Sequence, residues 1–175
     1  AISNQLGKIC EATDDEDILA AQRLLHIRIM DPQSFVTLVG ETGSGKSTII
    51  NGFLKEKVLP TAALPTTGTI TQLVNKIDIT DNEYYAINKD GTAEPINSEL
   101  FSNLARVPDE ELLRLQVRVR QEKPHLTNLN IFDTPGYNSL VAKHEEILRA
   151  FLPESDVIVY VVNHRTGFGM QDKIL

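Results

Sequence analysis

The feature that most constrains this chain is the glycine-rich segment G-E-T-G-S-G-K-S at residues 40–47. It fits the pattern G-x-x-x-x-G-K-[ST], in which backbone N–H groups surround phosphate oxygens. The apolar run Phe35 to Val39 predicts a buried strand before the segment, and Ser47 to Leu54 predicts a helix after it. A strand, a glycine loop and a helix N-terminus form an anion-binding concavity, because unpaired N–H groups lie at the positive end of the helix dipole. The segment therefore predicts a P-loop for a triphosphate.

A second pattern, D-T-P-G at residues 133–136, follows a short apolar run that predicts a strand ending at Asp133. Open α/β sheets bind ligands at the carboxyl ends of their strands. An aspartate at that place can hold Mg²⁺, and the N–H group of Gly136 can contact a γ-phosphate, so that the next segment senses the phosphate. The pattern alone is weak, but together with the P-loop it predicts a GTPase-type switch protein.

The remaining elements predict an α/β fold with a largely parallel sheet flanked by helices and with added antiparallel strands near Lys76 to Gln121. We expect residues 1–34 to form a helical segment, since Thr13 to Glu16 fits a capping box, and residues 35–175 to form the nucleotide-binding domain. The predicted strands are Thr69–Ile79, Tyr84–Ile87, Thr92–Ile96, Gln116–Gln121, Leu129–Asp133 and Val157–Val162. The second and third of these should form a hairpin, and the apolar strand at Val157–Val162 should be buried on both faces. We expect Ser98 to cap a short helix through Val107, and a further helix to start within Pro108 to Leu113.

Bulk composition limits the class of partner and the compartment. The net charge of -7 argues against a nucleic-acid partner. The single cysteine, Cys10, cannot form an internal disulfide, and no apolar stretch is long enough to span a bilayer. Without a visible secretory signal, the expected location is the cytoplasm, including the surface of a membrane.

The sequence around these motifs resembles the GTPase domain of the dynamin superfamily, and it is most similar to bacterial dynamin-like proteins, which read V-L-P-T-x-x-x-P-T-T after the P-loop helix. The resemblance covers roughly Phe35 to Gly167. It implies Mg²⁺-dependent GTP hydrolysis coupled to nucleotide-dependent homodimerisation, and membrane remodelling or tethering through regions outside this chain. The matching segments are Leu38–Glu41, Gly45–Asn51, Val58–Thr61, Leu64–Thr67 and Asp133–Gly136.

By this resemblance, Thr67, or next to it Thr66, supplies the switch threonine that closes over Mg²⁺ and the γ-phosphate. Lys46, Thr67 and Gly136 are the expected catalytic residues. The expected Mg²⁺ ligands are Ser47, Thr67 and Asp133. The full set expected to contact GTP or GDP is Glu41, Thr42, Gly43, Ser44, Gly45, Lys46, Ser47, Thr48, Thr66, Thr67, Asp133 and Gly136.

Two departures from related GTPases keep other functions open. Dynamins proper often carry Gln-Ser in the P-loop where this chain has Thr42 and Gly43, and Ras-like GTPases place a water-orienting Gln where this chain has Tyr137. A nucleotide-controlled interaction module with little or no hydrolysis is therefore one alternative. An interferon-inducible or septin-like GTPase is another, although it explains Leu64 to Thr67 less well.

A guanine-reading [NT]-K-x-D segment should follow the strand at Val157 to Val162 and a further helix. The chain looks like a fragment at both ends, and we expect the guanine-reading segment to lie beyond Leu175. The letters N-K-I-D do occur at residues 75–78, but they lie between the P-loop and D-T-P-G, inside a predicted strand. We therefore interpret residues 75–78 as ordinary strand residues.

Overall fold

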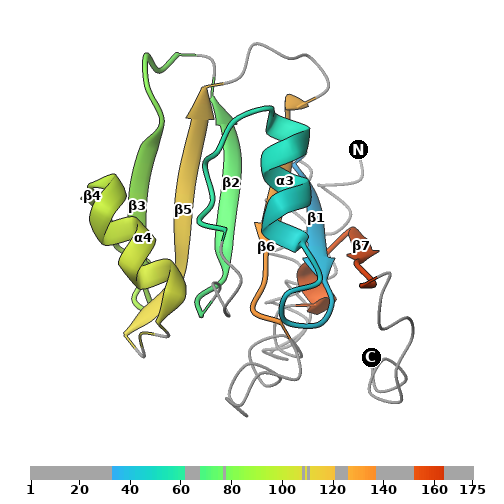
Figure 1. Cartoon of the computed structure of the whole chain (residues 1–175). Coiled ribbons are helices and arrows are strands. Elements are labelled where there is room, and N and C mark those ends of the chain that lie inside the picture. The colour runs from blue at the N-terminus through green and yellow to red at the C-terminus, as the bar shows by residue number, and fades with distance from the viewer. Residues whose placement is uncertain are drawn as a thin grey trace, which may run out of the picture. The chain divides into compact units, whose positions relative to one another are not determined.

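The computed structural model describes residues 33–61, 68–76, 78–107, 109, 111–120, 126–136 and 152–163. Within these ranges the chain forms one seven-stranded sheet with helices (Figure 1). The predicted helical segment at residues 1–34 lies outside them except for its last two positions. The elements are β1 (Ser34–Val39), α3 (Lys46–Leu54), β2 (Thr71–Lys76), β3 (Glu83–Asn88), β4 (Ala93–Ile96), α4 (Ser98–Arg106), β5 (Leu112–Arg120), β6 (Leu129–Asp133), the 3-10 helix η2 (Leu152–Glu154) and β7 (Val157–Tyr160).

The strand order across the sheet is β4-β3-β5-β2-β6-β1-β7. The neighbours β6, β1 and β7 run parallel, and β2 pairs with β5 in parallel. The pairs β2–β6, β3–β5 and β3–β4 are antiparallel. The sheet is therefore an α/β sheet with the predicted antiparallel addition, and that addition contains the predicted hairpin of β3 and β4.

Strand β5 shows how tertiary pairing overrides a local helix signal. A helix was predicted from Pro108 to Leu113, but Leu112 and Leu113 already belong to β5, so that prediction is wrong. The strand pairs with β2 on one side and with β3 on the other. Leu115, Val117 and Val119 are at most 1 % exposed, because this alternate set of side chains faces the core.

The predicted start of α4 shifts by one residue. Ser98 was expected to cap this helix, but Ser98 is its first helical residue and Asn97 is the cap. The Asn97 side chain accepts a hydrogen bond from the backbone N–H of Leu100 at 2.8 Å. The amide oxygen serves an N–H group that has no partner within the helix, which is the usual role of asparagine at this position.

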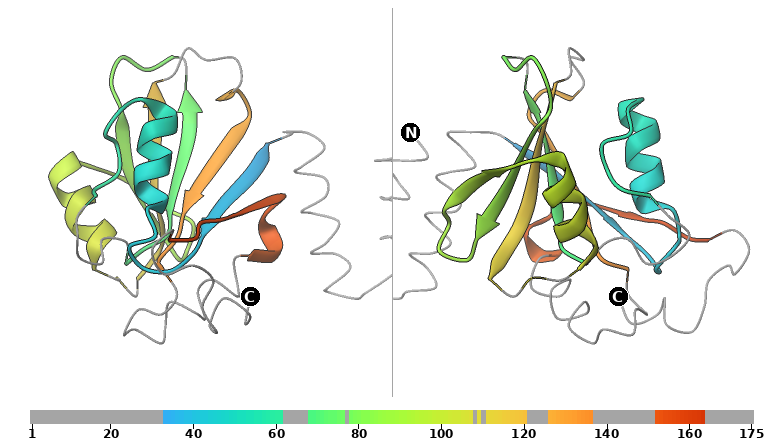
Figure 2. Two further views of the ribbon diagram at one scale, coloured as in Figure 1. Left: turned by 45° about the vertical axis from the view of Figure 1, so that its right-hand side comes forward. Right: turned by 60° about the vertical axis from the view of Figure 1, so that its left-hand side comes forward.

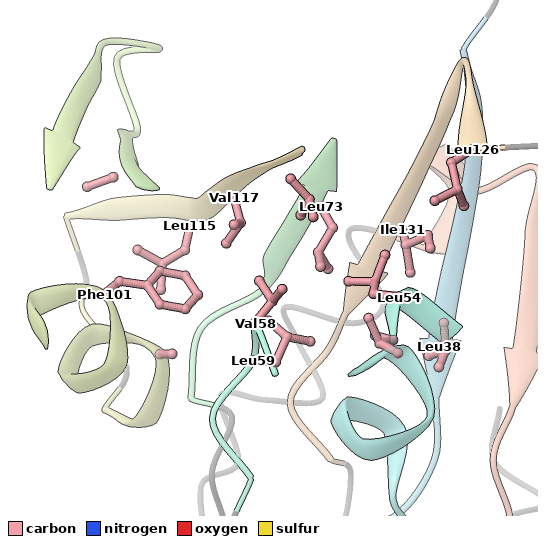
Figure 3. Close-up of a cluster of buried hydrophobic side chains, with 14 of the residues drawn as sticks. Leu38, Leu54, Val58, Leu59, Leu73, Phe101, Leu115, Val117, Leu126 and Ile131 are labelled. Atoms are coloured by element: carbon pink, nitrogen blue, oxygen red, sulfur yellow. The ribbon is translucent and has the colours of Figure 1, made fainter. Parts of the chain in front are cut away.

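Helices α3 and α4 cover the same face of the sheet (Figure 2). Helix α3 lies over β6, and α4 lies over β3 and β5. Between the helices and the sheet is one apolar cluster (Figure 3), to which α3 contributes Ile50 and Leu54 and α4 contributes Phe101 and Ala105. This packing holds α3, which begins at the P-loop, in a fixed place over the central strands.

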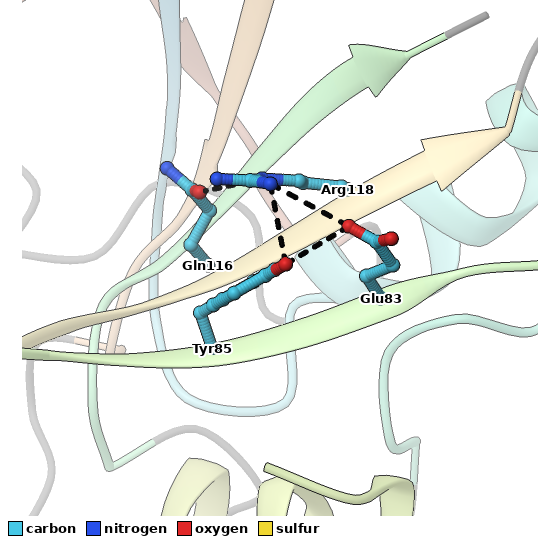
Figure 4. A network of polar contacts seen from close by, with 4 residues as sticks. All are labelled: Glu83, Tyr85, Gln116 and Arg118. Carbon is cyan, nitrogen blue, oxygen red and sulfur yellow. Dashed lines mark hydrogen bonds and ion pairs between the residues drawn. The ribbon is translucent and has the colours of Figure 1, made fainter. Parts of the chain in front are cut away.

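The other face of the antiparallel part carries polar side chains from β2, β5 and β3. Arg118 on β5 stacks over the ring of Tyr85, at 4.2 Å from the centroid, and pairs with Glu83 at 3.5 Å (Figure 4). The network continues to Gln116, which donates to the Gln72 side chain at 3.1 Å. These bonds cross from strand to strand and stabilise the register of the added strands.

Strand β7 is less buried than its composition suggests. Its apolar sequence predicted a strand buried on both faces, but Val157, Ile158 and Val159 are 38–50 % exposed. The reason is its position: β7 is the last strand of the sheet, and among the described residues it pairs only with β1. This part of the prediction is therefore wrong for the side chains, although the strand itself is present.

Candidate functional site

The predicted site residues that the structure describes lie at one edge of the sheet. Strands β1, β6 and β7 run parallel, so that their carboxyl ends lie at that edge. Strand β2 runs the other way and begins there, because Thr71 is paired with Asp133. The loop of residues 40–45 leaves β1 at the same edge and leads into α3. The edge thus collects the P-loop, the end of β6 and the start of β2.

Gly40 is a position that only glycine suits. Its φ is +152°, and a Cβ placed on it would lie 2.2 Å from the carbonyl oxygen of Val161. That carbonyl belongs to the backbone just after β7, which is held by the Val161 N–H bond to the Val39 carbonyl at 2.7 Å. Because neither group can turn away as a side chain can, the loop passes β7 without room for a methyl group.

The end of the loop leaves the start of α3 open to an anion. Gly45 is the cap residue, with φ +100°, and among the described residues no side chain bonds the first turn from this position and no acidic residue lies in that turn. The Ser44 hydroxyl is buried and has no hydrogen-bond partner in the described part of the chain. Open N–H groups and a donor hydroxyl suit phosphate oxygens.

Lys46 is buried and lies against its own loop. Only 5 % of this residue is exposed, and its Nζ donates to the carbonyls of Gly40 at 2.9 Å and Glu41 at 3.0 Å. Burial lowers the pKa of Lys46 below its ordinary value, while the charge of Asp133 raises it. Since a buried ammonium group gains most from an opposite charge, Lys46 is suited to a polyanionic ligand.

Ser47 and Asp133 form a preformed pair across the site. The Ser47 hydroxyl donates to Oδ2 of Asp133 at 2.6 Å, and the two residues are 86 positions apart in the sequence. Asp133 is 2 % exposed and lies at the end of β6, opposite Leu38 of β1. The next residue, Thr134, donates its hydroxyl to the Leu38 carbonyl at 2.7 Å, and this bond fixes the chain where it leaves the strand.

The P-loop and the D-T-P-G segment are in direct contact. The Thr42 hydroxyl donates to the Gly136 carbonyl at 3.4 Å. A Cβ placed on Gly136 would lie 2.4 Å from the backbone nitrogen of Thr42 and 2.5 Å from its Cα. The two predicted phosphate-contacting loops therefore touch through backbone atoms, and only a glycine allows this approach.

The other predicted residues fall into two groups. Gly43 lies at the turn of the loop with φ +76°, and Thr48 has an exposed side chain on α3. Thr66, Thr67 and Tyr137 lie outside the described residues, so their predicted roles stay predictions. The described chain that follows Thr67 is at the site edge, since β2 begins at Thr71 opposite Asp133.

The described residues of the N-K-I-D letters at residues 75–78 lie at the end of β2 that is opposite this edge, or just beyond it. Asn75 and Lys76 end β2, and β2 starts at the P-loop edge and runs away from it. A base bound next to the P-loop cannot be contacted from the opposite end of the strand. Asn75 and Lys76 are strand residues as interpreted, whereas Asp78 lies beyond the end of β2 and Ile77 lies outside the described residues.

Three residues with clear structural roles were absent from the predicted set. Gly40 passes the Val161 carbonyl, Thr134 bonds the Leu38 carbonyl, and Asn51 on α3 bonds the backbone of Val58 and Leu59. The first was visible as a fixed glycine of the P-loop pattern. Asn51 could have been noticed as a polar residue one turn after Ser47 on the same helix, whereas nothing in the sequence signals the partner of Thr134.

Parallel strands with a glycine loop after the first, and with an aspartate at the end of the neighbouring strand, define a P-loop nucleotide-binding protein of the GTPase type. The family model described as "Dynamin family" matches residues 36–173. The chain belongs to the dynamin family, and residues 36–173 are its GTPase domain. The resemblance expected from the motifs is thus confirmed.

Individual relatives are distant. The chain is 28 % identical over 134 residues, 77 % of its length, to "Probable transmembrane GTPase FZO-like, chloroplastic" of Arabidopsis thaliana. It is 21 % identical over 165 residues, 93 % of its length, to "Dynamin-like protein A" of Bacillus subtilis. These alignments cover 12 % and 13 % of the two relatives. The chain therefore spans only a small part of each of these proteins.

Solved structures share the fold. One, from a study titled "An oligomerised bacterial dynamin pair provides a mechanism for the long range sensing and tethering of membranes", matches with a TM-score of 0.61 at 19 % identity. The match covers 83 % of this chain and 23 % of that one. In the described part of the present chain, we find no helix with the length and apolar character needed to cross a membrane.

Proposed function

We propose that this chain is the nucleotide-binding part of an enzyme that hydrolyses GTP with Mg²⁺ and couples the nucleotide state to pairing of two copies and to action on a membrane. The observation that carries the proposal is the meeting of two loops at one edge of the sheet. Lys46 and Ser47 come from the P-loop and its helix, while Asp133 and Gly136 come from the end of β6.

The residues at this edge fit a triphosphate. Buried Lys46 supplies one positive charge, and the open first turn of α3 supplies N–H groups. In the proposed complex, Lys46 neutralises charge on the β- and γ-phosphates and Gly136 contacts the γ-phosphate. The roles of Thr66 and Thr67 rest on the family resemblance.

The same edge fits Mg²⁺ by the chemistry of its donors. A serine hydroxyl and a carboxylate are oxygen ligands of the kind that Mg²⁺ takes together with phosphate oxygens and water. The Ser47 hydroxyl oxygen and Oδ2 of Asp133 already lie 2.6 Å apart, so neither side chain needs to move far to bind a shared ion. When bound, Mg²⁺ would neutralise charge that develops on the phosphates.

Ser47 and Asp133 should affect binding through the metal. We expect Ser47→Ala and Asp133→Ala to weaken binding of GTPγS, a slowly hydrolysed GTP analogue, in Mg²⁺. The loss should be about tenfold or more, and clearly smaller in EDTA, because each removes an oxygen ligand of the ion. Calorimetry with and without Mg²⁺ measures the difference. The control is Ser102→Ala, which removes an exposed hydroxyl on α4. Equal losses in Mg²⁺ and in EDTA would mean that neither residue belongs to a metal site.

Guanine preference, pairing and membrane action are proposed from the relatives. The relative from Arabidopsis is named a probable transmembrane GTPase, and the structural match is described as an oligomerised pair that senses and tethers membranes. A net charge of -7 opposes self-association, so a pairing surface must be a local patch beside the nucleotide. Membrane contact would come from parts of the protein outside this chain.

A nucleotide-controlled interaction module with little hydrolysis is the second candidate. The observation that favours it is the Thr42 hydroxyl, which is directed at the Gly136 carbonyl and so is engaged within the protein. Thr42 and Gly43 stand at the two P-loop positions where dynamins proper often carry Gln-Ser, so this P-loop lacks that pair. Such a protein would bind GTP and change its surface without rapid turnover.

One experiment separates the two candidates. We expect the full protein to release phosphate from GTP over many turnovers, faster with liposomes present, and to sediment as a dimer with a GTP transition-state mimic and as a monomer with GDP. Phosphate release and sedimentation velocity are measured on the same preparation, with and without liposomes.

Tight GTP binding with no turnover would contradict the hydrolase proposal and favour the interaction module. Identical sedimentation with both nucleotides, well above micromolar protein, would contradict pairing. Absence of any GTP binding would contradict both candidates.

A further inference from the structure

One side chain of α3 bonds the backbone of another segment, and nothing above gives it a part in nucleotide binding. Asn51 lies one helical turn after Ser47. Its Oδ1 accepts hydrogen bonds from the N–H groups of Val58 at 3.0 Å and Leu59 at 2.9 Å. Its Nδ2 donates to the Leu59 carbonyl at 2.8 Å. Only this orientation of the amide makes all three bonds, because a flipped amide would place NH₂ against two N–H groups.

The bonded segment is buried and cannot easily replace this partner. Val58 and Leu59 are 6 % and 2 % exposed and belong to the apolar cluster beneath α3 and α4 (Figure 3). Asn51 satisfies both the N–H group and the carbonyl of Leu59, as a neighbouring strand would do. The Asn51 side chain therefore holds Val58 and Leu59 beside α3, in addition to the backbone bonds that turn the chain at Lys55 and Glu56.

The same stretch of chain is also held at its far end. The Gly68 N–H donates to the Ala105 carbonyl at 2.6 Å, and the Thr69 hydroxyl donates to the Leu104 carbonyl at 3.0 Å. Both carbonyls belong to the last turn of α4. The chain between Leu59 and Gly68 is thus anchored at its entry by α3 and at its exit by α4, and β2 then begins at the site edge.

We propose that Asn51 is a positioning residue for the triphosphate-bound state. Through its bonds to Val58 and Leu59, it fixes the entry of the segment that carries Thr66 and Thr67 relative to Ser47 on the same helix. The inference rests on the proposed function, in which a threonine of that segment contacts Mg²⁺ and the γ-phosphate. GDP needs the P-loop but no γ-phosphate contact, so Asn51 should matter for GTP and little for GDP.

Two variants of the full protein test this. Asn51→Ala removes all three bonds, and Asn51→Asp keeps the acceptors but sets an oxygen against the Leu59 carbonyl. We expect both variants to bind GTPγS in Mg²⁺ about fivefold or more weakly than the parent, which is the change in affinity that corresponds to one lost hydrogen bond. Their affinity for GDP should stay within about twofold of the parent's. Calorimetry gives both affinities, and thermal unfolding gives Tm.

The control is Val119→Ala, which creates a cavity at the sheet edge opposite the site, near the end of β5. It should lower Tm and leave the ratio of GTPγS to GDP affinity unchanged. Equal weakening of both nucleotides in the Asn51 variants, or a lower Tm with both affinities unchanged, would overturn the positioning role alone. A parent protein that binds no GTPγS would overturn the proposed function, and this inference with it.

Discussion

Lys46→Ala should weaken GTP binding by about 30-fold or more, which corresponds to a loss of more than ~2 kcal/mol for a charge-assisted contact. Lys46 is the buried cation of the loop, and its Nζ lies within 3.0 Å of the Gly40 and Glu41 carbonyls, so it is held where phosphates would sit. Its low exposure means that water screens its charge little. Isothermal calorimetry of the full protein measures the loss directly.

The matched control is Lys57→Ala, which removes an equal charge from an exposed site after α3. It should leave affinity nearly unchanged, because exposed charges at a distance are screened by salt. The fold should survive Lys46→Ala, since the carbonyls that lose the ammonium lie on a loop at the sheet edge. If Lys46→Ala and the parent bound GTP with equal affinity, the assignment of residues 40–47 as a P-loop would be wrong.

Gly136→Ala should reduce GTPγS binding by about tenfold or more, although it adds only one methyl group. That methyl would lie 2.4 Å from the Thr42 nitrogen and 2.5 Å from its Cα, so one of the two loops must move. Both loops supply the backbone N–H groups proposed to contact phosphates, and even small displacements of preorganised donors are costly. Calorimetry with GTPγS, beside thermal unfolding, measures the effect.

Gly52→Ala is the control for this substitution. Gly52 lies in α3, and a Cβ placed there meets nothing within 4 Å. Alanine is the better helix former, so this variant should be neutral or stabilised by up to ~1 kcal/mol, with unchanged nucleotide affinity. Parent-like binding by Gly136→Ala would show that the contact between the two loops does not constrain the site.

Much of the candidate site could be predicted because its motifs consist of residues that are adjacent in the sequence. The P-loop is a run of consecutive residues whose glycines adopt the required positive φ angles, as Gly43 and Gly45 do. The strand before it and the helix after it follow from short apolar patterns. Asp133 was predicted at a strand end for the same reason, since the apolar run before it reads as a strand wherever that strand is placed.

The errors occurred where neighbours, and not local pattern, decide the outcome. Leu112 and Leu113 have no strong strand signal, yet they extend β5 because β3 offers hydrogen-bonding partners. The apolar sequence of β7 suggests burial, but exposure depends on which strand comes next in the sheet. The cap of α4 shifted to Asn97, since both asparagine and serine can cap and only the chain path selects one.

The sequence by itself determined the P-loop, the strand before it and the helix after it, and the identity of the two phosphate-site motifs, because these depend on adjacent residues and their spacing. Only the tertiary structure decided which distant atoms meet. The Ser47 bond to Asp133, the contact of Gly136 with Thr42, and the Gly40 approach to the Val161 carbonyl all join segments far apart in the chain. Such contacts depend on the order of strands across the sheet and on their register, which parallel and antiparallel pairing and helix packing establish over the whole sheet.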